Sequence, residues 1–509
     1  MKVIFLFLFV AFCAHAQQTV GVFKHDPSLS YNGYTLFAPI TSKTTYLIDN
    51  DGQVVKQWRS QYGPGQAVML LNDGTLLRTG APAVQSMGGG GAGGLVEKFD
   101  WDGKLLWLFE HYGSTYRLHH DVEILPNGNI LLLVWESHTR EEAIAQGRIE
   151  SRLTENELWS ERIIEVRQTG PATGEIVWSW SSWDHMCQSI DPSKPNYSPG
   201  QNSPDRIDIN VGGTRSDWLH MNSVRYNAKR DEVLVSIHNL NELWIISRTS
   251  GDIVYRWGNP MLYQRGTMAD QKLFAQHDAR WLDSNGTRIT MFNNGSNRPN
   301  STPTNYSTVE EIVVPLDASG NYLRQPNAAF GPATSVWKYP EIGTTQFYAT
   351  NISGATRMPN GNTLACLGPQ GILTEVTADG KEVWRYVSPV GNMGPILQGQ
   401  TPRNTMIFKV YRFGPDHPAL AGKTLTKQGR LEDGPLDVHD AIPSPTSVQL
   451  DVLSRNVYIS VLVSGNIDVD AYDVSGRWLG KVVNEELSVG KHTRHAPHGT
   501  YLVVLREAR

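Results

Sequence analysis

The sequence predicts an all-β protein, a six-bladed β-propeller followed by a small C-terminal β-sandwich domain. The main evidence is a pattern that returns along the chain: two apolar strands joined by a polar Gly-containing turn, then a second Gly turn and a strand that carries tryptophan. Six tryptophans mark the ends of the copies: Trp58, Trp107, Trp178, Trp257, Trp337 and Trp384. Repeats of about 45 to 80 residues with four short strands are typical of propeller blades and not of helical solenoids.

Hairpin turns give independent support for the same units. Asn and Gly occur together between two apolar runs at residues 72–74, 127–128, 285–286 and 360–361, and such turns join neighbouring antiparallel strands. An array of β-sandwiches is the alternative, but the unit length and the tryptophan-bearing outer strands favour blades. Helical periodicity is scarce throughout the chain.

We expect a signal peptide over residues 1–16, the propeller over 17–443 and the β-sandwich domain over 444–509. The first residues contain Lys2, an apolar run and Ala14-His15-Ala16, which is the order of a secretory signal peptide. No later stretch stays apolar for long enough to predict a transmembrane segment. Two segments interrupt the blades: a charged insertion at 141–161 with one helix-like stretch, and a Pro- and Asn-rich segment at 188–217. We expect the second to form a long loop over one face, where loops often shape a binding site.

Charge and cysteine content narrow the class of protein. The net charge of −5 argues against nucleic acid as a partner. After the signal peptide only Cys187 and Cys366 remain, so at most one disulfide can form and a large core must stabilise the fold.

Histidines recur at one position of the repeat. The chain places His119-His120-Asp121 and His277-Asp278 just before a hairpin turn, and His220 within a few positions of the same place in the blade between them. The inner strands of a propeller begin near one mouth of the central channel, so we expect these imidazoles to converge there. One such histidine is more often a hydrogen-bonded core residue, but three in register indicate a site. His238 and His185 stay ambiguous.

An arginine and a glycine run lie near this predicted site. Arg298 follows the strand after His277 in a polar turn, and its planar guanidinium suits a tetrahedral oxyanion. The run Gly88–Gly91 lacks a following phosphate-loop lysine or helix, so we interpret it as flexible. Three imidazoles could also hold zinc, but the arginine and the scarcity of carboxylates favour an anion. We therefore expect no metal and no other cofactor.

Several ordered motifs resemble the bacterial arylsulfotransferase family. They are residues 218–224 (WLHMNSV), 243–248 (LWIISR), 275–279 (AQHDA) and 292–298 (FNNGSNR), and the likeness runs from about Tyr34 to Lys427. The resemblance implies a six-bladed propeller that moves a sulfuryl group from an aryl sulfate ester to a phenol without a nucleotide donor. It also implies a ping-pong mechanism through a sulfohistidine, with His220, His277 and Arg298 at family active-site positions.

One departure from the family pattern bears on the mechanism. The resemblance places the histidine that becomes sulfated in the last repeat, and the corresponding stretch here, Cys366–Leu373, contains none. Either His119 or His120 has taken this role, or transfer is direct, or the protein binds sulfated ligands without turning them over. Our leading hypothesis is an aryl-sulfate sulfotransferase that uses small aryl sulfates and phenols. The alternatives are a sulfate-ester hydrolase and a non-catalytic propeller that binds sulfated or aromatic ligands.

The expected site residues follow from these arguments. The catalytic ones are His120, His220, His277 and Arg298. The expected substrate-binding residues are His119, Asn222, Asn294 and Tyr348, and Phe347 is a further candidate to hold a phenolic ring.

The C-terminal residues carry a second resemblance. The sequence YDVSGR at 472–477 and the terminal GTYLVV at 499–504 resemble the sorting domains of proteins exported by the type IX secretion pathway. This likeness implies that the export machinery is a partner and that the protein is secreted, displayed on the cell surface or periplasmic.

Overall fold

The computed structural model describes residues 18–83, 86–198, 204–299, 305–325, 327–341, 343–344, 346–434, 448–453, 456–461, 465–472, 477–487, 490–495 and 502–508. The expected signal peptide, residues 1–16, lies outside the described residues. The chain forms two compact units, Met1–Leu436 and Asp437–Arg509. The first unit contains the predicted propeller.

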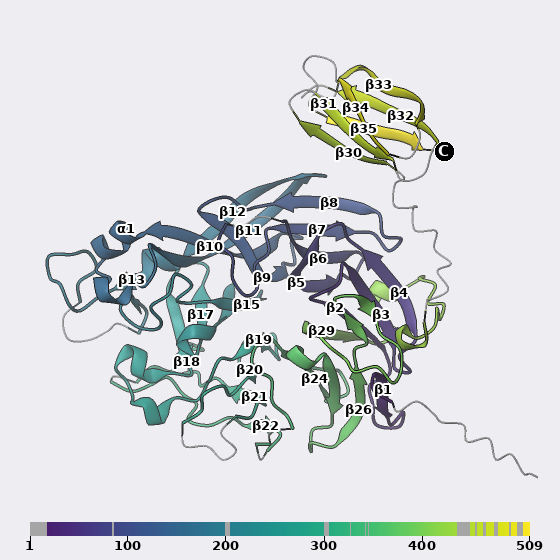
Figure 1. Ribbon diagram of the computed structural model, residues 1–509. Helices are drawn as coiled ribbons and strands as arrows, with labels where there is room; N and C mark the ends of the chain where they lie inside the picture. Colours follow the sequence, from purple (N-terminus) through teal and green to yellow (C-terminus); the bar gives the residue numbers. More distant parts are fainter. Residues whose placement is uncertain are drawn as a thin grey trace, which may run out of the picture. The chain divides into compact units, whose positions relative to one another are not determined.

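The described residues of the first unit form six antiparallel four-stranded blades, which confirms the predicted fold (Figure 1). From the innermost strand outward, blades 1 and 2 are β29 (Ile407–Phe413), β2 (Tyr34–Pro39), β3 (Thr44–Asp49) and β4 (Val54–Arg59), then β5 (Gly63–Leu70), β6 (Leu76–Ala81), β7 (Leu95–Phe99) and β8 (Leu105–Glu110). Blades 3 and 4 are β9 (Tyr116–Ile124), β10 (Ile130–Thr139), β11 (Glu157–Gly170) and β12 (Thr173–Ser181), then β15 (Met221–Asn227), β16 (Glu232–Ile237), β17 (Glu242–Ser247) and β18 (Ile253–Trp257). Blades 5 and 6 are β19 (His277–Trp281), β20 (Arg288–Asn293), β21 (Thr308–Val313) and β22 (Trp337–Tyr339), then β23 (Gly354–Arg357), β24 (Thr363–Leu367), β25 (Ile372–Val376) and β26 (Glu382–Val387).

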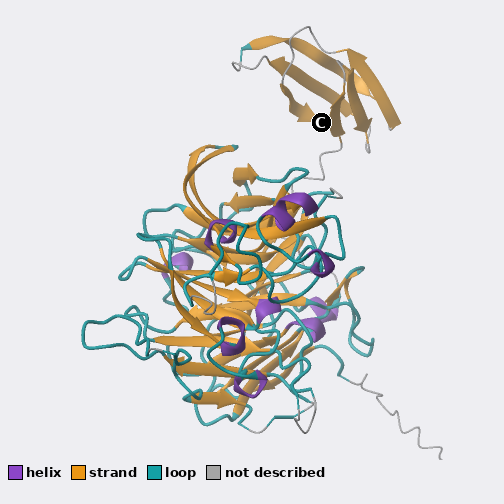
Figure 2. Ribbon diagram, turned by 90° about the vertical axis from the view of Figure 1, so that its left-hand side faces the viewer, coloured by secondary structure: helices purple, strands orange, loops and turns teal. Residues whose placement is uncertain are grey.

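The ring is closed by strands from the two ends of the unit. β29 forms the inner strand of blade 1 by pairing with β2, so this blade combines segments that are far apart in the sequence. At the other end, β1 (Gly21–His25) adds a fifth, outermost strand to blade 6 by pairing with β26. Figure 2 shows that strands dominate and that the helical pieces are short.

Tryptophan side chains link each blade to the next. In all six blades an indole Nε1–H donates a hydrogen bond of 2.8–3.0 Å to a backbone carbonyl of the following blade: Trp58 to Asp100, Trp107 to Thr173, Trp180 to Gly251, Trp257 to Pro332, Trp337 to Ala378, and Trp384 to Asn50. Five of these are tryptophans that the sequence pattern identified. In blade 3 the linking residue is Trp180, which pairs with Ile163, and not Trp178, which lies two positions earlier on β12 and pairs with Glu165.

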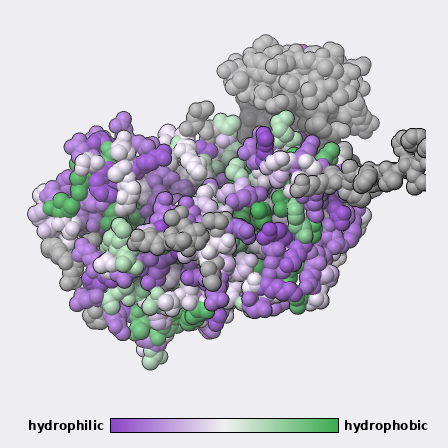
Figure 3. Space-filling view, turned by 60° about the horizontal axis from the view of Figure 1, so that its bottom comes forward, coloured by the Kyte–Doolittle hydropathy of each residue, from purple (hydrophilic) through white to green (hydrophobic). Residues whose placement is uncertain are grey.

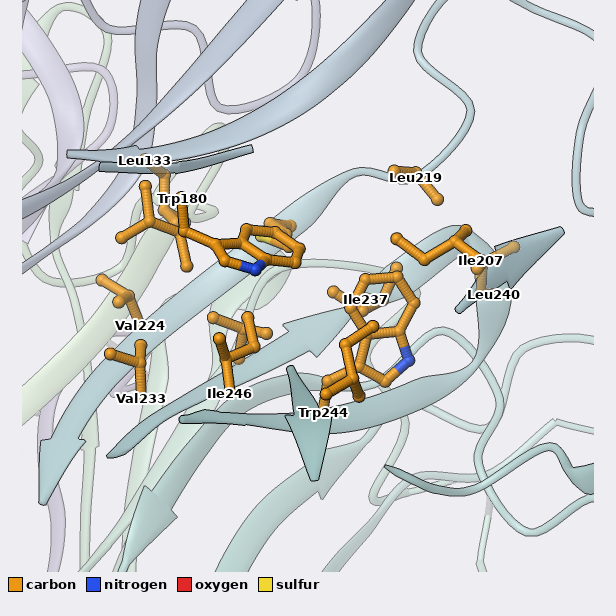
Figure 4. Packing of buried hydrophobic residues seen from close by; sticks show 14 of the residues in the cluster. Leu133, Trp180, Ile207, Leu219, Val224, Val233, Ile237, Leu240, Trp244 and Ile246 are labelled. Carbon is orange, nitrogen blue, oxygen red and sulfur yellow. The ribbon is translucent and has the colours of Figure 1, made fainter. Parts of the chain in front are cut away.

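The two predicted insertions are both packed against blades. The first contains the short helix α1 (Arg140–Ala145), whose Thr139 N-cap forms a capping box with Glu142. The second begins directly after β13 (Met186–Cys187) and contains β14 (Ile207–Asp208), which pairs with β13 in parallel. Ile207 and Leu219 from this region belong to the buried cluster between blades 3 and 4 (Figure 4). The insertion is thus anchored by buried apolar contacts at its C-terminal part.

On the face seen in Figure 3, hydrophilic residues predominate and hydrophobic ones form small separate groups.

Described strands of the second unit form two three-stranded sheets: β30 (Val448–Leu453), β31 (Asn456–Val461) and β34 (Gly490–His495), and β33 (Trp478–Leu487), β32 (Gly465–Tyr472) and β35 (Leu502–Ala508). Within the described part of the chain, no helix has the length and apolar character needed to cross a membrane.

Candidate active site

An unusual backbone conformation occurs within the inner strand of blade 3 and next to the start of the inner strands of blades 4 and 5. His120 and His220 have φ angles of 48° and 58°, and Ala275 and Asp278, which flank His277, have φ angles of 58° and 54°. Residues other than glycine rarely adopt this left-handed backbone conformation, and those that do cluster at functional sites. The repeated backbone shape therefore aims an imidazole from each of three blades toward one region.

Four imidazole rings form a continuous row. The ring centroids of His120 and His220 are 4.5 Å apart, those of His220 and His238 are 5.2 Å apart, and those of His238 and His277 are 5.1 Å apart. The structure therefore brings the three predicted histidines together, and His238 connects two of them. His238 directly follows β16, whose Ile237 pairs with Met221, so hairpin register was the sequence signal that could have placed it beside His220.

Three polar side chains hold the rings through their Nδ1 atoms. The distances to Nδ1 are 2.5 Å from Asp217 Oδ2 to His220, 2.6 Å from Asn239 Oδ1 to His238, and 2.8 Å from Asn294 Oδ1 to His277. Asn239 and Asn294 each donate their amide Nδ2 to backbone carbonyls, so their Oδ1 atoms must face the imidazoles. An acceptor at Nδ1 fixes the Nδ1–H tautomer and leaves Nε2 as the free ring nitrogen.

His119 supports His120 from behind. Its side chain is fully buried, its Nδ1 lies 2.9 Å from Nδ1 of His120, and its Nε2 lies 2.9 Å from Oε2 of Glu161. The ring also stacks on Trp135 with centroids 4.3 Å apart. We expected His119 to bind substrate, but the structure places it in a supporting position between His120 and a buried carboxyl group.

The glycine run packs against the histidines. A Cβ atom on Gly91, whose φ is +83°, would lie 2.1 Å from the His120 ring, and the His120 amide donates to the Gly91 carbonyl. Only glycine permits this close approach and this φ angle. We interpreted the run as flexible because it lacked a phosphate-binding context, but its function here is to admit the His120 ring.

A cavity of about 850 Å³ opens beside the row of imidazoles. His220, His238, Asp217 and Trp159 are among its walls, and the other residues are Gly88, Gly89, Gly90, Ser114, Thr115, Ser137, Thr139, Glu155, Asn156, Glu157, Arg215, Ser216 and Asn239. Both insertions contribute to it. This volume is large enough for a small aromatic ester and a second ring.

The other predicted site residues lie within blades 4 to 6. Asn222 is buried and donates to the Gln276 carbonyl at 2.8 Å. The Arg298 guanidinium packs on the rings of Phe274 and Tyr306, with its Nη2 3.3 Å from Thr308 Oγ1. These contacts are to residues of its own blade.

The two aromatic candidates differ in exposure. Tyr348 is half-buried, with its hydroxyl 3.4 Å from Ser296 Oγ. Phe347 is buried and packs against Phe292 with centroids 5.9 Å apart. Phe347 is therefore a core residue and does not offer its ring to a ligand.

The site combines one basic imidazole with several neutral ones. Burial lowers the pKa of His220, but the neighbouring Asp217 carboxylate and Glu161 outweigh it, so the pKa is raised above its usual value. Burial and the charge of His220 lower the pKa of His238 to about 4. Burial and neighbouring histidines hold the pKa values of His120 and His277 well below the usual range. Near neutral pH, His220 is the imidazole best able to carry positive charge.

A buried charge network fixes the inner strands beneath the histidines. Asp121 and Asp278, which follow His120 and His277, bind Arg225 at 2.8 and 3.4 Å, and both also contact Lys409. Arg280 adds an ion pair of 2.9 Å to Asp278. The network joins the inner strands β9, β15, β19 and β29, and thereby holds the backbone that presents the imidazoles.

Neither a disulfide nor a metal cluster is present among the described residues of this unit. Cys187 and Cys366 are both buried, free thiols. Among the described residues, no group of three or more His, Cys, Asp and Glu side chains is arranged to hold a metal ion.

The fold and the site define the protein as a six-bladed β-propeller with a row of imidazoles beside a cavity. Residues 19–386 match the family model described as Arylsulfotransferase (ASST), so the chain belongs to the arylsulfotransferase family. Membership implies an arylsulfotransferase-type function. A search of curated proteins finds no match.

Solved structures with a similar fold are remote in sequence. A protein of unknown function from Bacteroides caccae is 13% identical with a TM-score of 0.41, and the match covers 75% of this chain and 99% of that chain. The β-propeller domain of Myceliophteria thermophila Cps50 (Swd1) is 11% identical with a TM-score of 0.39, covering 74% and 89%. A streptogramin B lyase is 10% identical with a TM-score of 0.35, covering 75% and 87%. At these TM-scores none of them bears on the site.

Proposed function

We propose that this protein transfers a sulfuryl group from an aryl sulfate ester to a phenolic acceptor, without a nucleotide donor, in the cavity beside the imidazole row. The observation that carries the proposal is the contrast between His220, which Asp217 keeps basic, and the neutral imidazoles around it. A sulfuryl group in transfer spreads negative charge over its oxygens, much as a phosphoryl group does. A fixed imidazolium in a buried site stabilises that charge better than water can.

His120 supports the proton exchange at His220. It lies beside His220 and connects through His119 to Glu161, whose pKa burial raises well above the usual value. A carboxyl group in its neutral form can donate or accept a hydrogen bond without adding charge. We infer that Glu161 and His119 hold the His120 ring next to His220, which exchanges its proton with the leaving and attacking phenols.

The cavity also suits the two substrates. Trp159 contributes an aromatic ring to its wall, and Ser114, Ser137 and Thr139 are among its polar lining residues. Pockets for small ligands combine apolar surface with a few placed polar groups. His277 and Arg298 lie in the neighbouring blade, and we keep both as contributors to sulfuryl binding.

Release of 4-nitrophenol from 4-nitrophenyl sulfate by the purified mature protein tests the proposal. We expect release that depends on added phenol, that is lost in His220→Ala and that is kept in His185→Gln, a variant of a histidine outside the row. Release without phenol would identify a sulfate-ester hydrolase instead. A folded protein that gives no release with any acceptor would show that the cavity only binds its ligands.

For the C-terminal residues we propose a role in export. The support is the sequence likeness at 472–477 and 499–504, together with the compact unit Asp437–Arg509. Deleting residues 444–509 should then leave the protein inside the cell envelope, and unchanged secretion of the truncated chain would refute this role.

A further inference from the structure

The identity of the nucleophile is open, because the stretch Cys366–Leu373 contains no histidine. Of the described residues that line the cavity, two are histidines, His220 and His238. His220 pairs its Nδ1 with Asp217 Oδ2 at 2.5 Å, a contact that favours the imidazolium form, which has no lone pair with which to attack. His238 is therefore the remaining imidazole in the cavity wall, among the described residues, that can attack an ester.

The hydrogen bonds around His238 present a ring nitrogen with a lone pair. Asn239 Nδ2 donates to the carbonyl of Asp217 at 2.8 Å, so its Oδ1, 2.6 Å from His238 Nδ1, must accept. His238 is thus held as the Nδ1–H tautomer with its lone pair on Nε2. Oδ1 of Asn239 would also stabilise the positive charge that develops on the His238 ring once Nε2 has formed a bond.

The electrostatic setting favours attack by this ring. Burial and His220 lower the pKa of His238 to about 4, which keeps it neutral at pH 7. The basic His220 lies next to it, with centroids 5.2 Å apart, and can bind the sulfuryl oxygens. His120 and His277 are also neutral, but His120 is enclosed by Gly91 and His277 is fully buried. The cavity wall therefore offers a neutral imidazole and a cationic one side by side.

His238 also has a structural counterpart in blade 6. It begins the turn η3 (His238–Leu240) between the second and third strands of blade 4, and Asn241 ends that turn with a φ of 59°. Gly368 begins the matching turn η6 (Gly368–Gln370), which Gly371 ends with a φ of 63°. This turn lies within the stretch that lacks the expected histidine. The two blades thus use one turn shape, and only blade 4 carries an imidazole there.

We propose that Nε2 of His238 is the nucleophile and carries the sulfuryl group as a sulfohistidine between the two half-reactions; this inference rests on the proposed function. In the first half-reaction the Nε2 lone pair forms the N–S bond, the S–O bond to the aryl group breaks, and its electron pair leaves on the phenolate oxygen. The phenolate takes the Nε2 proton of His220. In the second, the acceptor phenol gives its proton to His220, its oxygen attacks sulfur, and the N–S electron pair returns to His238. Atoms and charge balance in both steps, and His220 ends as it began.

The test is to trap the intermediate. Wild-type protein mixed with 4-nitrophenyl sulfate, without an acceptor, should gain the mass of one sulfuryl group and release about one equivalent of 4-nitrophenol in a burst. Proteolysis and mass spectrometry should place the group on the peptide that contains His238. His238→Ala should lose the adduct and about 10³-fold or more of the phenol-dependent rate, whereas His185→Gln should keep both.

Further variants protect the test against a folding artefact. His238→Gly should recover part of its activity when free imidazole is added, which a merely misfolded protein would not. In His120→Ala the adduct should still form on His238, more slowly. An adduct on His120 or His277, or a full burst from His238→Ala, would overturn the assignment of His238 while leaving sulfuryl transfer intact. No adduct and no release from the wild-type protein would overturn both the assignment and the proposed function.

Discussion

The Oδ2 atom of Asp217 lies 2.5 Å from Nδ1 of His220, and this pair joins the end of the second insertion to the start of an inner strand. Burial alone would keep His220 neutral, so the charge that the site needs depends on this carboxylate. The long insertion therefore contributes electrostatics to the active site as well as a wall.

Asp217→Asn should lower the pKa of His220 because the neutral amide cannot stabilise an imidazolium. We expect phenol-dependent transfer at pH 7 to fall about 10²-fold, and the basic limb of the pH–rate profile to move to lower pH. NMR titration of His220 measures the shift directly. Asp184→Asn, in a carboxylate outside the cavity, is the control. An unchanged pH profile in Asp217→Asn would show that the pair has only a structural role.

Gly91→Ala should displace the His120 ring, since the new Cβ would lie 2.1 Å from it. A displacement on the order of 1 Å in an active site lowers the rate about 10²-fold. Gly103→Ala is a matched control because Gly103 has a similar φ of +90° but open space around its Cβ position. It should lose about 1 kcal/mol of stability from the left-handed backbone and keep its activity. Equal activity loss in both variants would assign the effect to backbone strain.

The propeller could be predicted from local patterns because each blade repeats one hairpin chemistry. Trp58, Trp107, Trp257, Trp337 and Trp384 all occupy the outer strands that the pattern indicated. The choice of Trp180 over Trp178 could not be predicted, because both tryptophans lie on β12 two positions apart and the local pattern fits either one. Closure by β29 was also beyond local reasoning, since it pairs residues from the two ends of the propeller sequence, such as Tyr34 and Phe413.

The candidate site was only partly predictable from the sequence. The repeat located His120, His220 and His277, because all three occur at nearly the same position of the repeating unit. His238 comes from the end of a second strand, and only its pairing with β15 brings it to His220. Glu161 and Asp217 lie in segments that looked like insertions. Their roles depend on tertiary packing, which leaves little periodic signal in the sequence.

Stability should rise with pH between about 4 and 6.5 because of His238. The folded protein holds this imidazole neutral with a pKa of about 4, whereas the unfolded chain takes up a proton below about 6.5. The unfolded state binds more protons in this window, so stability falls as pH falls through it, by at most about 3 kcal/mol for this group. The contribution of His220 to stability has the opposite pH dependence, because its raised pKa gives stability that is lost at higher pH.

Urea unfolding of wild type and His238→Asn at a series of pH values checks this expectation. The variant should show a shallower fall in stability from pH 6.5 to 4, whatever its stability at pH 7. Parallel curves for the two proteins would contradict the neutral, buried state of His238.

Trp384→Phe should weaken the junction between blades 6 and 1. The indole of Trp384 is fully buried and donates to the Asn50 carbonyl at 2.8 Å, so the variant leaves that carbonyl without its donor. A loss of about 1–3 kcal/mol is typical for such a group. Trp178→Phe is the control because Trp178 is half-buried, where its ring packs on Arg248 and on the edge of the buried cluster between blades 3 and 4. Chemical denaturation should separate the two variants, and equal losses would refute the linking role of Trp384.

Lys409→Met should be among the most destabilising single changes in the propeller. Lys409 is buried and contacts Asp121 and Asp278, and burial by itself raises the pKa of both carboxyl groups. Arg280, Lys409 and Arg225 instead lower the pKa of Asp278 to about 2, so removing Lys409 takes away one of the three cations that compensate this buried negative charge. The expected loss is about 3–5 kcal/mol, against about 0.5 kcal/mol for Lys427→Met, whose side chain is 59% exposed. Because Asp121 and Asp278 follow His120 and His277 directly, the folded fraction of Lys409→Met should also transfer sulfuryl groups more slowly. Full activity per folded molecule would show that the network stabilises the ring of blades without positioning the imidazoles.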